Sequence, residues 1–324
     1  MKQFSISAII CAYSDERWND LVDAVTSIRS QTLPVDEIII VIDHNPRMFE
    51  HAQKGLENVR VVENVNERGA SGARNTAIGL AKGEILAFID DDAVYALDCL
   101  ERLVEHFDNE EVMGVGGYLI PKWESVRPAW FPEEFYWVVG CTFRGMQTDP
   151  RYIRNLIAAC MCLRREIFSS IGDFHSGLGP GSQGFYCEET ELCIRTKKRW
   201  PDRFFIYEPR ALAYHHVPAK RANFSYFRSR CYVEGISKSV VVQFAGGSSG
   251  LASERLYALK NLPSGIWRGI VETFRGDFSG ITRSSAIIVG LGCTLAGYIA
   301  GNLNRLFQPN IHRMADYGMR ELTE

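Results

Sequence analysis

The chain has 324 residues, of which 46% are hydrophobic and 23% charged, a mixture that excludes collagen-like, low-complexity and largely disordered proteins. Lysine and arginine total 36 against 39 aspartates and glutamates, so the chain lacks the basic excess of a nucleic-acid binder. Nine cysteines without a Cys-x-x-Cys pair argue against a disulfide framework or a zinc site and indicate reduced thiols in a cytoplasmic protein.

Apolar runs rich in β-branched residues alternate with helical patterns through the first part of the chain. The run at 37–42, Glu-Ile-Ile-Ile-Val-Ile, is typical of a strand that is covered on both faces. We expect strands at 4–12, 37–42, 59–62, 84–89 and 112–120, with helices at 17–31, 72–81 and 97–107. This alternation predicts an α/β fold with a doubly wound, mostly parallel sheet.

The later part of the chain has a less regular pattern. Residues 121–152 are rich in Trp, Pro and Phe and have little periodicity. We then expect a strand at 155–163, a helix at 164–171, a glycine-rich loop at 175–184, a helix at 187–200, short strands at 204–207 and 211–215, and a long helix at 223–244. The predicted organisation is one large domain at 1–245, with halves at 1–120 and 121–245, and a helical C-terminal region at 246–324.

Three consecutive aspartates, Asp90, Asp91 and Asp92, follow directly on the predicted strand at 84–89. Open α/β sheets bind ligands at the carboxyl ends of their strands, which is where these carboxylates fall. Side chains alternate along an extended segment, so Asp90 and Asp92 should point the same way and Asp91 the other. Oxygen ligands suit Mg²⁺ or Mn²⁺, and the alternative is an acidic turn that caps the helix near Leu97.

Two further polar features follow neighbouring strands. Asp43 ends the strand at 37–42, where a carboxylate can accept from a nucleobase; the alternative is a simple turn residue. The segment Asn66 to Asn75 has glycines that allow close backbone approach, and its Arg68 and Arg74 suit phosphate or, alternatively, surface ion pairs. The segment matches neither the dinucleotide fingerprint nor the P-loop.

Taken in chain order, these motifs resemble those of family-2 glycosyltransferases, which have the GT-A fold and use nucleotide-diphosphate sugars. The resemblance covers about residues 4 to 245 and departs from the family pattern at His44-Asn45. It implies a nucleobase site, a nucleotide site and a bound divalent cation. The residues implied are Ala12, Tyr13 and Asp43 for the base, Arg68 and Arg74 for the nucleotide, Asp90 for the ribose, and Asp92 for the metal, with Asp91 as a further substrate-binding residue.

The segment Tyr186 to Arg195 resembles the family's catalytic helix. This resemblance implies that Glu189 is the general base for the acceptor hydroxyl, with Glu188 as its helper. The alternative is a helix N-terminus that is acidic because of the helix dipole. The resemblance also makes His215 a metal ligand, although an ordinary histidine is the alternative, and Arg221 would close over the diphosphate or lie on a solvated basic face.

The acceptor is narrowed by two sequence features. A processive polysaccharide synthase of the family has Gln-x-x-Arg-Trp and several membrane spans, whereas this chain has Thr196-Lys-Lys-Arg-Trp200, which favours transfer of one sugar. The run Arg230 to Ser239 resembles a branch that builds lipid-linked oligosaccharides, including transfer of glucuronosyl groups to dolichyl-phosphate-linked acceptors. The sequence therefore predicts an inverting hexosyl- or hexuronosyltransferase of envelope glycan synthesis, with a UDP-sugar donor, Mn²⁺ or Mg²⁺, and a lipid-linked or polysaccharide acceptor.

Residues 284–304 contain no charged side chain and are about long enough to span a bilayer. Together with the aromatic and basic residues before them, they predict membrane contact through 251–304, at the surface or embedded, on the cytoplasmic face. A helix buried in a soluble domain or a dimer interface is the alternative. Two rival functions also remain at this point: a nucleotidyltransferase, and a non-enzymatic carbohydrate-binding or assembly module on the same scaffold.

Overall fold

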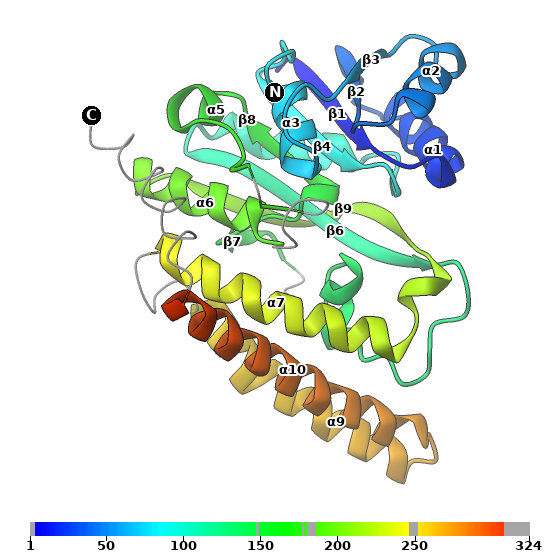
Figure 1. The fold of residues 1–324 in the computed structure, drawn as a ribbon, viewed down its shortest axis with the longest axis vertical. Helices are drawn as coiled ribbons and strands as arrows, with labels where there is room; N and C mark the ends of the chain where they lie inside the picture. The colour runs from blue at the N-terminus through cyan, green and yellow to red at the C-terminus, as the bar shows by residue number, and fades with distance from the viewer. Residues whose placement is uncertain (1–3, 147–148, 177, 180–185, 246–251, 308–324) are drawn as a thin grey trace. The chain divides into compact units, whose positions relative to one another are not determined.

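The computed structural model describes residues 4–146, 149–176, 178–179, 186–245 and 252–307 (Figure 1). The chain divides into two compact units. The first unit comprises Met1–Lys122, Gln147–Gly184 and Glu188–His216, and the second comprises Trp123–Met146, Phe185–Cys187 and Val217–Glu324.

The described residues form one nine-stranded sheet of order β3-β2-β1-β4-β8-β6-β9-β5, and β7 pairs with β9. The strands are β1 (Ile6–Ala12), β2 (Glu37–Ile42), β3 (Arg60–Glu63), β4 (Ile85–Asp90), β5 (Ala93–Tyr95), β6 (Val112–Trp123), β7 (Arg151–Ile153), β8 (Met161–Arg164) and β9 (Phe204–Val217). Strands β3, β2, β1 and β4 are parallel, β8 is antiparallel to β4 and β6, and β5 and β7 are antiparallel to β9. The predicted α/β class with a parallel sheet half is therefore present, and the other half of the sheet contains antiparallel pairs.

The parallel part of the sheet forms because its strands are apolar on both faces. In β2 every residue from Ile38 to Ile42 is buried, and Ile39 pairs in register with Ile9 of β1. Gly83 precedes β4 where the chain passes close to β1, and a Cβ there would lie 2.4 Å from the backbone N of Ser7. This close approach places β4 beside β1 and so fixes where its carboxyl end emerges.

The helices of the first unit connect these strands. They are α1 (Trp18–Arg29), α2 (Pro46–Gly55), α3 (Ala70–Ile78), α4 (Cys99–Val104), α5 (Glu166–Ile171) and α6 (Glu188–Arg199), with 3₁₀ turns at Asp15–Arg17, Glu105–Asp108 and Ala158–Cys160. Helix α2 was not predicted from the sequence. Asn45 caps it by accepting from the Met48 N–H at 3.1 Å, and Pro46 occupies its first turn, where the missing N–H costs nothing.

Two expectations for the later segments differ from the structure, and a third is not tested by the described residues. The segment expected as a strand at 155–163 instead forms the 3₁₀ turn Ala158–Cys160, followed by β8. The two short strands expected at 204–207 and 211–215 are one continuous strand, β9. Most of the glycine-rich loop expected at 175–184, namely residues 177 and 180–184, lies outside the described residues.

The second unit is mainly helical, and it includes the C-terminal helices that the sequence predicts, together with segments of the predicted domain at 1–245. Its elements are the 3₁₀ turns η3 (Glu133–Val139) and η5 (Ala219–Arg221), the helices α7 (Phe224–Ala245) and α8 (Ala252–Leu256), the π-helical turn η7 (Tyr257–Asn261), and the helices α9 (Leu262–Phe274) and α10 (Ser279–Phe307). Helix α10 runs alongside α7 and α9 (Figure 1). By length and composition, Ser279–Leu303 of α10 could cross a membrane, with a mean hydropathy of 1.7 and 28% of its most apolar stretch buried.

Candidate active site

Three parallel strands bring predicted site residues to one edge of the sheet. Ala12 and Asp90 are the last residues of β1 and β4, and Cys11 pairs in register with Asp90. Asp43 directly follows β2, and its backbone N–H donates to the Ala12 carbonyl at 2.8 Å. Ala12, Asp43 and Asp90 therefore start the loops at the edge where open α/β sheets bind ligands.

The three residues Asp90, Asp92 and His215 lie together. One ligand atom from each, a carboxylate oxygen or an imidazole nitrogen, lies within 4.8 Å of the other two. His215 is brought there by β9, which pairs it with Ala93 of β5, and its Nε2 lies 3.1 Å from Asp92 Oδ1. Two carboxylates and an imidazole form a donor set that fits Mn²⁺ or Mg²⁺.

Arg17 is a site residue that sequence reasoning missed. Its guanidinium Nη1 lies 2.7 Å from Asp91 Oδ1 and 3.1 Å from Asp92 Oδ2, and it packs over the Tyr13 ring at 5.1 Å. Burial raises the pKa of Asp91 to about 7, although Arg17 opposes the shift. Asp91, which was predicted to face away from Asp90, is thus held by Arg17. A basic residue in the loop after the first strand was the available signal.

Arg74, on α3, is buried between carboxylates. Its Nη1 donates to Glu188 Oε1 at 3.0 Å, and its Nη2 lies 3.5 Å from Asp90 Oδ1. Burial works against the charged form, but Glu188, Glu189 and Asp90 raise the pKa of Arg74 above its usual range. Arg74 therefore joins the aspartates after β4 to the glutamates at the start of α6.

The two glutamates at the start of α6 are in different environments. Glu188 is buried, and within the described part of the chain its Oε2 has no hydrogen-bond partner. Glu189 accepts from the Ala158 N–H at 3.3 Å. Burial, then the charge of Glu188, raise the pKa of Glu189 to about 8, with Arg74 opposing the shift. A carboxyl group with such a pKa exchanges protons near neutral pH.

The remaining predicted residues are placed as follows. Both carboxylate oxygens of Asp43 are engaged, one by the Asn64 amide at 2.6 Å and the other by the Gly69 N–H at 3.0 Å. Gly69 is the N-cap of α3 with φ of 122°, so Asp43 fixes the loop that carries Arg74. In addition, Ala12 is buried, Tyr13 is half exposed, Arg68 is exposed, and Arg221 lies in η5 of the second unit.

Replacing Arg74 by methionine should strongly destabilise the fold. The substitution leaves the buried Glu188 carboxylate without its cation, which typically costs about 3–5 kcal/mol of unfolding free energy. The double variant Arg74→Met/Glu188→Gln should recover much of that loss, and Arg68→Met should change stability by less than about 0.5 kcal/mol because Arg68 is exposed. Urea denaturation measures all three, and a wild-type midpoint for Arg74→Met would refute the buried ion pair.

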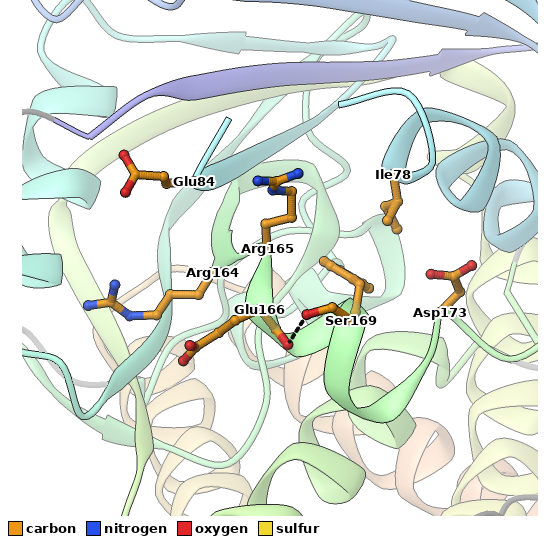
Figure 2. Close-up of a pocket in the computed structure, with 8 residues that line it drawn as sticks. Ile78, Glu84, Arg164, Arg165, Glu166, Ser169 and Asp173 are labelled. Atoms are coloured by element: carbon orange, nitrogen blue, oxygen red, sulfur yellow. Dashed lines mark hydrogen bonds between the residues drawn. The ribbon is translucent and has the colours of Figure 1, made fainter. Parts of the chain in front are cut away.

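A separate hollow of about 580 Å³ lies elsewhere on the first unit (Figure 2). It is lined by Glu84, Arg164 and Glu166 among others, and Ser169 Oγ donates to the Glu166 carbonyl at 3.1 Å beside it. Glu84 immediately precedes β4, so the hollow borders the amino end of that strand, roughly 16 Å along the chain from Asp90. It contains none of the predicted site residues.

Comparisons with known proteins agree with this geometry. Residues 7–172 match the family described as Glycosyl transferase family 2. The glucosyl-dolichyl phosphate glucuronosyltransferase of Haloferax volcanii is 32% identical over 241 residues, which cover 73% of this chain and 77% of the relative.

Solved structures show the same fold at low identity. The mannosyltransferase PcManGT of Pyrobaculum calidifontis, in complex with GDP-Man and Mn²⁺, aligns with a TM-score of 0.56 at 16% identity over 98% of this chain and 86% of its own. GalNAc-T7 with UDP, GalNAc and Mn²⁺ aligns with a TM-score of 0.54 at 15% identity over 79% of this chain and 54% of its own. From the family match and the archaeal relative together, the chain belongs to glycosyltransferase family 2 and is a glycosyltransferase.

Proposed function

We propose that the protein is an inverting, divalent-metal-dependent glycosyltransferase that moves one sugar from a UDP-sugar to a hydroxyl of a lipid-linked acceptor. The observation that best supports this proposal is that Arg74 contacts both the aspartates after β4 and the glutamates at the start of α6. Its guanidinium lies between Asp90, a member of the Asp90–Asp92–His215 cluster, and Glu188, beside Glu189. Cation-binding groups and a protonatable carboxyl thus lie on one compact unit, as single-displacement sugar transfer requires.

The nucleotide end of the reaction is assigned to the edge of the sheet. Ala12, Tyr13 and Asp43 would contact the base, while Asp90 would approach the ribose. Asp92 and His215 would hold Mn²⁺ or Mg²⁺, which when bound neutralises charge on the departing diphosphate. Arg17 holds the carboxylates of Asp91 and Asp92 in place. Arg68 would add positive charge near the phosphates.

The acceptor end of the reaction is assigned to Glu189. An inverting transfer needs one base, which takes the proton of the acceptor hydroxyl as its oxygen attacks the anomeric carbon. A carboxyl with a pKa of about 8 is a stronger base than an exposed glutamate and is still partly ionised at neutral pH. Glu188, fixed by Arg74, would raise the basicity of Glu189 through its negative charge.

The Haloferax volcanii relative narrows the range of donors and acceptors to be proposed. Its name describes transfer of a glucuronosyl group to glucosyl-dolichyl phosphate. By extension, we propose that the present chain uses a hexuronosyl or hexosyl donor. Its acceptor would be a sugar linked to polyprenyl or dolichyl phosphate at the cytoplasmic face of a membrane. In this proposal the halves 1–120 and 121–245 serve donor and acceptor, and 246–324 serves membrane contact. The family match and the relative named above both favour a glycosyltransferase over a nucleotidyltransferase or a non-enzymatic module.

The proposed function is tested by donor turnover with a lipid-linked acceptor. Purified protein with Mn²⁺ is given UDP-glucuronate, UDP-glucose or GDP-mannose, each with and without glucosyl-dolichyl phosphate. Acceptor-dependent release of UDP, with a β-linked product from an α-linked donor by NMR, is the expected result. Release only from GDP-mannose, a product with the donor's anomeric configuration, or equal turnover in EDTA would each contradict part of the proposal.

The raised pKa of Glu189 also predicts how stability depends on pH. In the folded protein the Glu189 carboxyl has a pKa of about 8, so it keeps its proton until the pH approaches 8. In the unfolded chain its pKa is 4.5, and the proton is lost near that pH. Between these values the folded state binds more protons, so this group makes stability fall as pH rises through the window. The melting temperature of wild type should therefore fall more steeply from pH 5 to 8 than that of Glu189→Gln, measured by calorimetry. Parallel slopes for the two proteins would exclude the raised pKa.

A further inference from the structure

Helices α9 and α10 carry large apolar side chains that are exposed among the described residues of the second unit. Their exposed fractions range from 50% at Ile281 to 89% at Phe274. We call this set the apolar face, and it consists of Trp267 and Phe274 on α9 and Ile281, Ile288, Leu295 and Ile299 on α10. Soluble surfaces rarely carry such a contiguous row of large apolar residues without a binding role.

The geometry of α10 places its exposed row opposite α7. Nine residues make two and a half turns of an α-helix, so residues nine apart point in opposite directions. Gly290 and Gly297 pack on α7, where added Cβ atoms would lie 2.9 Å from Phe227 and 1.9 Å from the Tyr232 carbonyl. Ile281 and Ile288 are nine positions before these glycines. The exposed row of α10 thus faces away from α7.

The same relation holds on α9. Gly265 packs inward, because a Cβ there would lie 2.6 Å from Glu134 Oε1, and Phe274 is nine positions later. The two helices also touch each other, with the Ser284 hydroxyl donating to the Ile266 carbonyl at 2.9 Å and Gly280 against Gly269. Because Gly269 packs on α10, Trp267 and Phe274, two and five positions from it, lie on the side of α9 that is turned away from α10. The apolar face thus consists of one exposed row on each of the two helices.

The packing of α10 decides between lying on a bilayer and crossing one. A spanning helix is surrounded by lipid or by other spanning segments, in which charges are rare and costly. Helix α10 instead packs along α7, which carries Glu234 bonded to Arg230 at 3.0 Å and to Lys238 at 3.1 Å. Crossing the membrane would take these charges into hydrocarbon. Lying in the interface buries only the apolar face.

The charges around the apolar face complement anionic lipid. Arg255, Lys260 and Arg275 are exposed and make no ion pair within the described residues. The acidic residues Glu272 of α9 and Asp277, which precedes α10, are instead paired, because each lies 2.6 Å from the Arg283 guanidinium. Lys260 lies seven positions before Trp267 and Arg275 directly follows Phe274, so the described residues supply unpaired positive charge next to the row of α9. Positive charge attracts anionic headgroups, and Trp267 suits the headgroup level of the interface.

We propose that the apolar face docks the second unit in the plane of an anionic phospholipid surface, with α9 and α10 lying parallel to the bilayer. The proposal rests on the proposed function for the membrane contact of 246–324, and the geometry of α9 and α10 deepens it by specifying how the contact is made. It adds to that function a position at the surface where a lipid-linked acceptor is found. A second copy of the chain on the same face is the competing occupant and is an outcome of the test.

The test is flotation of the full chain with vesicles. The probes are phosphatidylcholine vesicles with and without about 30% phosphatidylglycerol, since anionic lipid should strengthen binding. Wild type should float with the anionic vesicles, and Ile288→Glu/Leu295→Glu should bind at least about tenfold more weakly because two exposed apolar contacts become charged. Arg275→Ser should reduce the preference for anionic vesicles. Val126→Glu, at a 91% exposed position outside these helices, is the matched control and should float like wild type.

Three results would overturn the proposal. The first is that wild type stays in the aqueous fraction, and the second is that the double variant floats as well as wild type. The third is that wild type is a dimer without lipid while the double variant is a monomer, which would assign the face to a second copy. Melting temperature and stabilisation by UDP should be equal in wild type and the double variant. Loss of UDP stabilisation in both would contradict the proposed function while leaving the vesicle result intact.

Discussion

Replacing Asp92 by alanine should lower sugar transfer by on the order of 10²- to 10³-fold or more, because the site loses a ligand for the charge that offsets the leaving diphosphate. Asp92 is buried, with one oxygen 3.1 Å from His215 and the other 3.1 Å from Arg17. The measurement is acceptor-dependent UDP release over a range of Mn²⁺ concentrations. Excess Mn²⁺ should not restore the rate.

The controls for this prediction separate chemistry from folding. Asp92→Asn keeps the shape of the side chain and should show a similar loss with near wild-type unfolding. Asp23→Ala, at an exposed position of α1, should keep wild-type activity. Full activity of Asp92→Ala would remove Asp92 from the proposed metal site, whatever the fold.

Replacing Glu189 by glutamine should lower transfer by on the order of 10²- to 10⁴-fold, the usual contribution of a general base. Glutamine preserves the size of the side chain and can still contact the Ala158 N–H, which Glu189 contacts at 3.3 Å. Donor binding should survive, since the nucleotide is assigned to the other end of the site. The measurements are transfer rate and UDP-dependent thermal stabilisation in the same preparation.

The pH profile gives this prediction a second readout. A base with a pKa of about 8 makes kcat/KM rise about tenfold per pH unit below that value and level off above it. Glu189→Gln should lose the rising limb, while Glu57→Gln, at an exposed position, should keep it. Transfer by Glu189→Gln at the wild-type rate would assign the base to another residue.

The donor half of the fold was predictable because its strands have strong local signals. The runs in β1, β2 and β4 are apolar on both faces, so they read as buried parallel strands, and the acids that follow them mark one edge of the sheet. The meeting of Asp90 and Asp92 with His215 followed from the family resemblance, because His215 is more than a hundred positions away in the sequence. No periodicity would have placed it there.

The continuous strand β9 shows why the later part was less predictable. Glu208-Pro-Arg210 looks like a break between two short strands, since proline removes a ladder donor. In the structure Glu208 is buried and bonded to His106 at 2.7 Å, a residue 102 positions earlier, and to the Arg210 guanidinium. This contact with a residue far away in the sequence stabilises the strand where proline removes a hydrogen bond. It has no local sequence pattern from which it could be predicted.

The same reasoning applies to Arg17. Sequence spacing places an arginine in the loop after β1, but an exposed loop arginine and a buried counterion look alike in sequence. Only the fold shows that Asp91 and Asp92, which follow β4, lie next to the loop after β1 and that both contact Arg17. Clusters of like charge in a sequence therefore indicate that a counterion exists and do not identify it.

Titration of Mn²⁺ by electron paramagnetic resonance, with UDP present, tests the central claim most directly. Wild type should bind one ion per chain, His215→Ala and Asp92→Asn should lose most of that binding, and Glu189→Gln should retain it. Retention of wild-type Mn²⁺ affinity in both His215→Ala and Asp92→Asn would contradict the account, because the cation would then lie outside the Asp90–Asp92–His215 cluster.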